Sequence, residues 1–231
     1  MQHNSGFAKF LRVTGIVLMS LTAAFTLMGG IGTVCAALFT EKYAAESESM
    51  AKLLGWGWLY TIFMLVTIAI GVLMIRAVIL LIKAAPTSYR DTLISLVAGV
   101  VVGVIHIFVS RALRGASMPV DMVTYTAVVT LIVFLIFRIP GIWSGVDFTQ
   151  GKTSARTAGG AAAIVFGSIC LAIPSLAGPS HTWALGINWA DAFDRSLVPL
   201  GLLLIIGGLL ALAASAVDKF PAAQASLSPK K

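Results

Sequence analysis

The side chains best suited to chemistry gather in one short stretch of this sequence. His106, Ser110 and Arg114 are spaced by four residues, so a helix would place all three on one face. Arg111 and Asp121 complete the set, and we name these five residues the His106 cluster. A histidine, two arginines and a carboxylate lying together are suited to binding an anion, a quinone headgroup or a proton. A later segment offers three more polar residues that would join it: His181, Asp191 and Asp194.

The same cluster also has a purely structural interpretation, which the sequence favours. Arg111 and Arg114 would extend their charged ends to the lipid headgroups while their aliphatic stems stay in the apolar layer. Asp121 would neutralise one arginine and thereby pin two neighbouring helices together. His106 would then make a single hydrogen bond between helices.

Arg76 is a second candidate, because an ionisable group deep in a membrane is costly and is therefore often functional. If its helix begins near residue 59, Arg76 lies about 9 Å inside the end of that helix. If the helix begins at residue 53, Arg76 lies at the membrane boundary. Trp56 and Trp58 favour the second alternative, since tryptophan prefers the headgroup level.

Familiar catalytic patterns are absent from the sequence. His106 is the only histidine inside an apolar segment, whereas a bis-histidine haem site needs two at that depth. Neither H-E-x-x-H nor G-x-x-x-x-G-K-[ST] occurs, and the segment 141–145 (GIWSG) does not fit G-x-S-x-G. The sequence therefore predicts no catalytic residue, no metal site and no cofactor.

The composition indicates which elements must hold these residues. Of the 231 residues, 58% are apolar and 11% are charged, whereas soluble domains carry roughly 25% charged residues. Such a chain requires a lipid bilayer as its solvent. The net charge of +7 fits attraction to lipid headgroups better than nucleic-acid binding, because no basic run is interleaved with aromatic residues.

Six apolar segments meet or approach the roughly 20 residues that a helix needs to cross a bilayer. We therefore predict an all-α transmembrane helix bundle with short loops, in one domain over 1–220, followed by a flexible cytoplasmic tail over 221–231. The predicted spans are 13–39, 53–82, 92–110, 118–139, 158–179 and 196–217.

The distribution of Lys and Arg predicts that both termini lie in the cytoplasm. With the N-terminus inside, eleven of the sixteen basic residues fall on the inner side and five on the outer side. The first apolar run carries no charge over 13–40, which is longer than the apolar region of a secretory signal, so we expect a retained helix. The plasma (inner) membrane is the expected location.

Small and hydroxyl side chains indicate how the helices pack. Gly99 and Gly103 have the G-x-x-x-G spacing, and Ala163 and Gly167 repeat that separation. Packing within one chain is favoured over a homodimer contact. Threonines recur in the first and fourth segments, where they are expected to bond to the backbone four residues earlier, although they would also suit a polar lumen.

Two function classes remain open. The first is a non-catalytic accessory or scaffold subunit of a membrane complex, which the short loops and the lack of catalytic motifs favour. The second is a small-solute or ion transporter or channel that uses the His106 cluster. A membrane enzyme acting on lipid or quinone is a more remote alternative. The expected partners are the lipid bilayer and other membrane subunits, and not nucleic acid.

Overall fold

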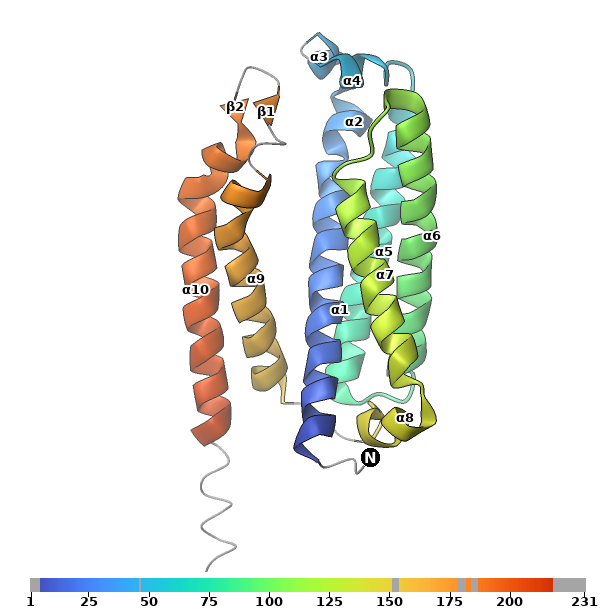
Figure 1. Cartoon of the computed structure of the whole chain (residues 1–231). Coiled ribbons are helices and arrows are strands. Elements are labelled where there is room, and N and C mark those ends of the chain that lie inside the picture. The colour runs from blue at the N-terminus through green and yellow to red at the C-terminus, as the bar shows by residue number, and fades with distance from the viewer. Residues whose placement is uncertain (1–4, 46, 151–153, 178–181, 184–186, 218–231) are drawn as a thin grey trace, which may run out of the picture. The chain divides into compact units, whose positions relative to one another are not determined.

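The computed structural model describes residues 5–45, 47–150, 154–177, 182–183 and 187–217. Regular structure over these residues is almost entirely helical (Figure 1), which confirms the all-α prediction. Six helices are long and apolar enough to cross a membrane, so the predicted number of spans is also confirmed. The elements in chain order are α1 (Gly6–Gly32), α2 (Val34–Leu38), α3 (Thr40–Ala44), α4 (Glu48–Ala51), α5 (Gly57–Lys83), α6 (Ser88–Arg114), α7 (Val120–Phe137), α8 (Pro140–Val146), α9 (Ala155–Ala177), β1 (Thr182–Trp183), β2 (Ile187–Asn188) and α10 (Trp189–Val217).

Most helix boundaries differ by several residues from the predicted spans, and the starts of α5 and α10 are two examples. The predicted span 53–82 forms a helix only from Gly57, because Gly55 adopts a φ of +84° and turns the chain just before it. The predicted span 196–217 belongs to a helix that begins at Trp189, since residues 189–195 include no glycine or proline to stop it.

The chain forms two compact units. Unit 1 comprises Met1–Lys152 with Thr182–Ile187, and unit 2 comprises Thr153–His181 with Asn188–Lys231. The expected single domain over 1–220 remains a prediction, and each unit is described by itself. The predicted tail over 221–231 lies outside the described residues.

Unit 1 is a ring of four long helices. α1 contacts both α5 and α7, and α6 closes the ring by contacting the same two helices. Figure 1 shows the four running side by side, with the short helices α2–α4 at one end and α8 at the opposite end. The His106 cluster belongs to the end near α2–α4, which we call the His106 end. The end near α8 is called the Arg12 end.

Buried polar pairs and close-packed aromatic rings hold this ring together. The Thr22 and Thr130 hydroxyls lie 2.7 Å apart and join α1 to α7, while the Tyr89 hydroxyl donates to the Phe134 carbonyl at 2.7 Å and joins α6 to α7. A Cβ on Gly15 would lie 2.9 Å from the Phe137 ring, so α1 comes this close to the aromatic core only with glycine there.

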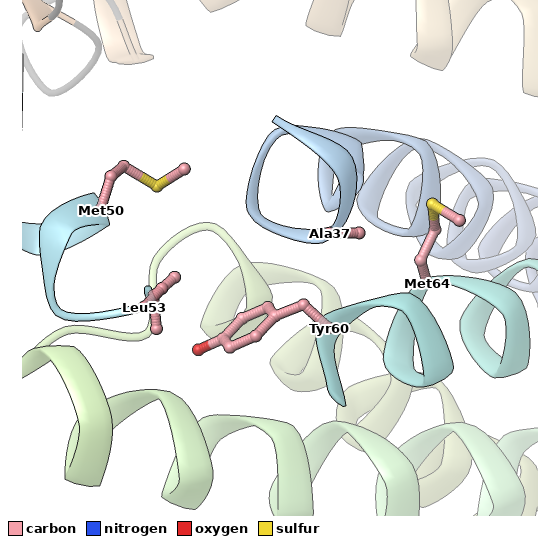
Figure 2. Packing of buried hydrophobic residues seen from close by; sticks show 5 residues of the cluster. All are labelled: Ala37, Met50, Leu53, Tyr60 and Met64. Atoms are coloured by element: carbon pink, nitrogen blue, oxygen red, sulfur yellow. The ribbon is translucent and has the colours of Figure 1, made fainter. Parts of the chain in front are cut away.

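A buried apolar cluster secures the His106 end. Figure 2 shows Tyr60 of α5 between Met50 and Leu53 on one side and Ala37 and Met64 on the other. All five are at most 8% exposed, so the short helices α2 and α4 are packed firmly against the start of α5. At this end of unit 1, the short helices and the start of α5 therefore share one packed apolar core.

Unit 2 is an antiparallel pair of helices, α9 and α10, packed through glycine. A Cβ on Gly160 would lie 2.8 Å from the Gly208 carbonyl oxygen, and one on Gly167 would lie 2.5 Å from that of Gly201. Both pairs are reciprocal, since a Cβ on Gly208 would lie 2.6 Å from the Gly160 carbonyl oxygen and one on Gly201 would lie 2.8 Å from that of Gly167. Gly167 was predicted as a packing residue, whereas the contribution of Gly160 was not predicted.

Candidate functional site

An ion pair and a serine hydroxyl form a closed network at the His106 end. The Arg111 guanidinium donates from Nη2 to Asp121 Oδ1 and from Nε to Ser117 Oγ, both at 2.9 Å. Ser117 Oγ in turn donates to Asp121 Oδ2 at 2.5 Å. Asp121 and Ser117 are 5% and 3% exposed, so this carboxylate is buried but fully engaged. The prediction that Asp121 pairs with one of the two arginines is confirmed.

The other members of the His106 cluster make separate contacts. Arg114 donates from Nη2 to the Met118 carbonyl at 2.7 Å and so braces the turn between α6 and α7. Ser110 is fully buried and shares a hydrogen bond of 2.9 Å with the Tyr60 hydroxyl of α5. Ser117 and Tyr60 were not singled out from the sequence, because a serine in a turn and a tyrosine near a helix start carry no signal of their own.

His106 makes ring contacts with two aromatic residues of α5. Its imidazole stacks on the Phe63 ring at a centroid distance of 4.2 Å and an angle of 7°, and meets the Tyr60 ring edge-on at 5.5 Å. No hydrogen bond between described residues reaches it, and it is 4% exposed. Two aromatic neighbours on α5 thus flank the imidazole, and the interhelical hydrogen bond stays a prediction.

His106 also lines a small cavity inside the four-helix ring. The cavity measures about 20 Å³, which is enough for about one water molecule. Its polar neighbours include Thr26, Thr33, Thr67 and Thr124, while glycine and aliphatic residues form the rest of the wall. A cavity of this size does not form a continuous polar lumen.

The threonine hydroxyls are mostly turned toward their own helices, as predicted. Thr26 Oγ1 donates to the Thr22 carbonyl at 2.7 Å, Thr33 to Gly29 at 2.8 Å and Thr124 to Val120 at 2.9 Å. Each of these bonds spans four residues of one helix. The hydroxyl protons are therefore already used within the helices.

Arg76 lies in a position that the favoured interpretation did not predict. Because α5 starts at Gly57, Arg76 is seven residues before its end at Lys83, or about 10 Å along the axis. Its side chain is 68% exposed, and Nη2 lies 3.9 Å from Asp91 Oδ2. At that distance, Arg76 is only loosely paired with Asp91.

The Arg12 end contains a polar group that was not predicted as a site. Arg12 is 6% exposed and donates from Nη1 to the Gly145 carbonyl at 3.5 Å, which ties α1 to α8. Asp147, 8% exposed, accepts from the Thr149 amide at 2.9 Å and from Gln150 Nε2 at 2.8 Å. Only the fold reveals this group, because the residues are separated by more than a hundred positions.

Several expectations about the site lie beyond the described residues. His181 is outside them, and the side chains of Asp191 and Asp194 are likewise not described. Gly99 and Gly103 do pack within the chain as favoured, against Met74 of α5 and Thr124 of α7. Comparison with protein-family models, with curated proteins and with solved structures yields no match.

Proposed function

We propose that this protein is a non-catalytic accessory or scaffold subunit of a membrane complex. The observation that carries the proposal is the use of buried polar side chains as joints between helices. Asp121 is engaged by Arg111 and Ser117, and Ser110 by Tyr60. Polar groups held in this way stiffen a helix bundle, and a stiff bundle is what a scaffold requires.

The outward faces of the helices support a role in contacting other molecules in the membrane. α10 exposes a series of large aliphatic side chains, including Leu203 at 68% and Leu210 at 66%. In a bilayer such a face contacts lipid or other helices. The proposal is that some of these faces contact partner subunits.

Purification from native membranes in a mild detergent tests the proposal. We expect a partner at a fixed molar ratio in the purified material, retained through size exclusion. An unrelated multi-spanning protein with the same tag serves as the control and should not bring down that partner. A monodisperse monomer that retains only lipid and detergent would contradict the proposal.

A small-solute or ion transporter is the second candidate, and the cavity beside His106 favours it. A buried histidine next to threonines at membrane depth is suited to handling a proton or a small polar solute. Under this alternative, His106→Ala and Arg114→Ala should each abolish solute flux in reconstituted vesicles while the protein stays folded. Unchanged flux in both variants would discard these residues as a pathway. We rank this candidate second because the cavity has a volume of only about 20 Å³, too small for a continuous pathway.

The proposed orientation has both termini in the cytoplasm, and the proposed location is the plasma (inner) membrane. The support is the eleven-to-five distribution of basic residues predicted from the sequence. Single cysteines placed at the two ends of a cysteine-free variant should both resist a membrane-impermeant thiol reagent in intact cells. Labelling of either end before lysis would overturn this orientation.

A further inference from the structure

An open groove lies at the His106 end of unit 1, and none of its lining residues belongs to the His106 cluster. Its volume is about 530 Å³, within the range of small-molecule sites. One side consists of residues 37–42, which include the end of α2 and the start of α3. The other side consists of Leu54, Gly55, Gly57 and Trp58 at the start of α5.

The floor of the groove is closely packed. Ala37 is 8% exposed and belongs to the buried cluster that includes Leu53 and Tyr60 (Figure 2). A Cβ on Gly57 would lie 3.1 Å from the Ala37 carbonyl oxygen, so α2 and α5 meet closely beneath the groove.

The walls combine exposed apolar groups with a pair of opposite charges. Leu38, Phe39 and Trp58 are 59%, 46% and 61% exposed. Beside them are the exposed side chains of Glu41 and Lys42. An amphiphile that carries both charges in its headgroup has the matching chemistry.

The two charges in the groove differ from their neighbours in having no ion-pair partner among the described residues. At the same end, Glu48 is paired with Lys52 at 2.7 Å, and Asp121 with Arg111 at 2.9 Å. Lys42 instead places its ammonium 5.5 Å above the Tyr43 ring. Among the described residues, Glu41 and Lys42 therefore form no ion pair, whereas Glu48 and Lys52 are paired with each other.

The groove lies at the level where lipid headgroups are found. α1 and α2 together form a span of 33 residues, about 50 Å long, which exceeds a hydrocarbon core of about 30 Å. The excess carries one end of this span beyond the hydrocarbon. The Trp56 and Trp58 rings, 6.5 Å apart, are typical of that boundary.

We propose that this groove binds a phospholipid with a zwitterionic ethanolamine headgroup. Lys42 contacts the phosphate, and Glu41 accepts hydrogen bonds from the primary ammonium. Leu38, Phe39 and Trp58 contact the glycerol and the first acyl carbons. A choline headgroup has no N–H to donate to Glu41, and a glycerol headgroup has no cation, so both bind more weakly.

Native mass spectrometry of the detergent-purified full chain tests this preference. Phosphatidylethanolamine, phosphatidylcholine and phosphatidylglycerol with identical acyl chains are titrated separately. We expect ethanolamine lipid to bind about three- to tenfold tighter than the other two, which is the gain that one additional solvent-exposed hydrogen bond would give. Equal affinities for all three lipids would overturn the proposal.

Two substitutions test which part of the headgroup each charged residue contacts. Glu41→Gln should remove the preference for ethanolamine over choline, and Lys42→Gln should weaken binding of all three phospholipids. Glu48→Gln and Lys52→Gln are the matched controls, since they change the same residue types at the same end of unit 1. A preference that survives Glu41→Gln, or that is lost equally in the controls, would refute the assignment.

Two further measurements check the source of the ligand and the position of the chain. Soluble phosphoethanolamine at millimolar concentration should not displace the lipid, because it lacks the chain that Leu38 and Trp58 contact. Full displacement would show that the site takes a free zwitterion. In vesicles, ethanolamine lipid brominated near the glycerol should quench tryptophan emission more than choline lipid brominated at the same position does. The difference should vanish in Trp58→Phe; if it persists, Trp58 does not line the site.

Discussion

Arg111 on α6 and Asp121 on α7 form an ion pair across the turn between these helices, with 2.9 Å between Nη2 and Oδ1. The Arg111 side chain is 57% exposed and that of Asp121 is 8% exposed. The buried carboxylate therefore needs the pair to compensate for its lost hydration, whereas the exposed guanidinium can be solvated if its partner is lost.

Replacement of Asp121 tests whether this pair joins the helices. Asp121→Ala leaves Ser117 buried without its acceptor, and we expect the free energy of unfolding to fall by about 1–3 kcal/mol. Unfolding by SDS titration in mixed micelles measures the change. The double variant with Arg111→Ala should lose less than the sum of the single losses, since each removes the same contact. Strict additivity would mean that the two residues are not coupled.

The close approach of α6 and α7 at Gly103 gives a second prediction. A Cβ at this position collides with Oγ1 of Thr124 and lies 3.0 Å from its Cγ2, so Gly103→Ala must displace the side chain or the helix. We expect a destabilisation of about 1–3 kcal/mol in the same assay. Gly32→Ala is the control, because no atom lies within 4 Å of its added Cβ. Equal stabilities of the two variants would contradict the packing described for Gly103.

Two adjacent glycines of α10 provide a matched test of unit 2. A Cβ on Gly208 would lie 2.6 Å from the Gly160 carbonyl oxygen, whereas one on Gly207 has no neighbour within 4 Å. The reporter is a disulfide between cysteines replacing Thr157 and Ser215, whose hydroxyl oxygens lie 2.7 Å apart. In a background without native cysteines, Gly208→Ala should slow the cross-linking severalfold, and Gly207→Ala should leave it unchanged. The same rate in both would argue against glycine packing.

The pair on α4 gives a prediction about pH. The hydrogen bond and charge of Lys52 lower the pKa of Glu48 below its ordinary value. A lowered pKa means that the pair is complete above the ordinary glutamate pKa and is lost as the pH falls through the lowered value. Carboxyl ¹³C NMR of the labelled protein should show a lower titration midpoint for Glu48 in the wild type than in the Lys52→Gln variant. Identical titration midpoints would exclude the pair in solution.

The pattern of apolar residues predicted the helical architecture correctly. Six spans follow from composition and length alone, because a bilayer leaves the backbone no other way to satisfy its hydrogen bonds within a single segment. The backbone bonds of Thr26, Thr33 and Thr124 were predictable for the same reason, since they are contained within one helix. The pairing of Asp121 was predictable because only a short turn separates it from Arg111 and Arg114.

The contacts of His106 and Arg12 were not predictable from their positions in the chain. His106 stacks on Phe63, forty-three residues away, and Arg12 reaches Gly145 across 133 residues. The local spacing does not encode which helix faces another, because apolar residues dominate every long helix. The start of α5 was likewise misplaced, since Leu53 is apolar enough for a span yet lies in the turn that closes the buried cluster.

The sequence by itself determined that this protein is a membrane-spanning helical bundle, because hydrophobicity over about 20 residues is a local property of the chain. Only the tertiary structure decided which polar groups meet, which rings flank His106 and where a groove opens beside Glu41 and Lys42. Those outcomes depend on how side chains from distant segments fill shared space, and packing of that kind is a property of the assembled helices.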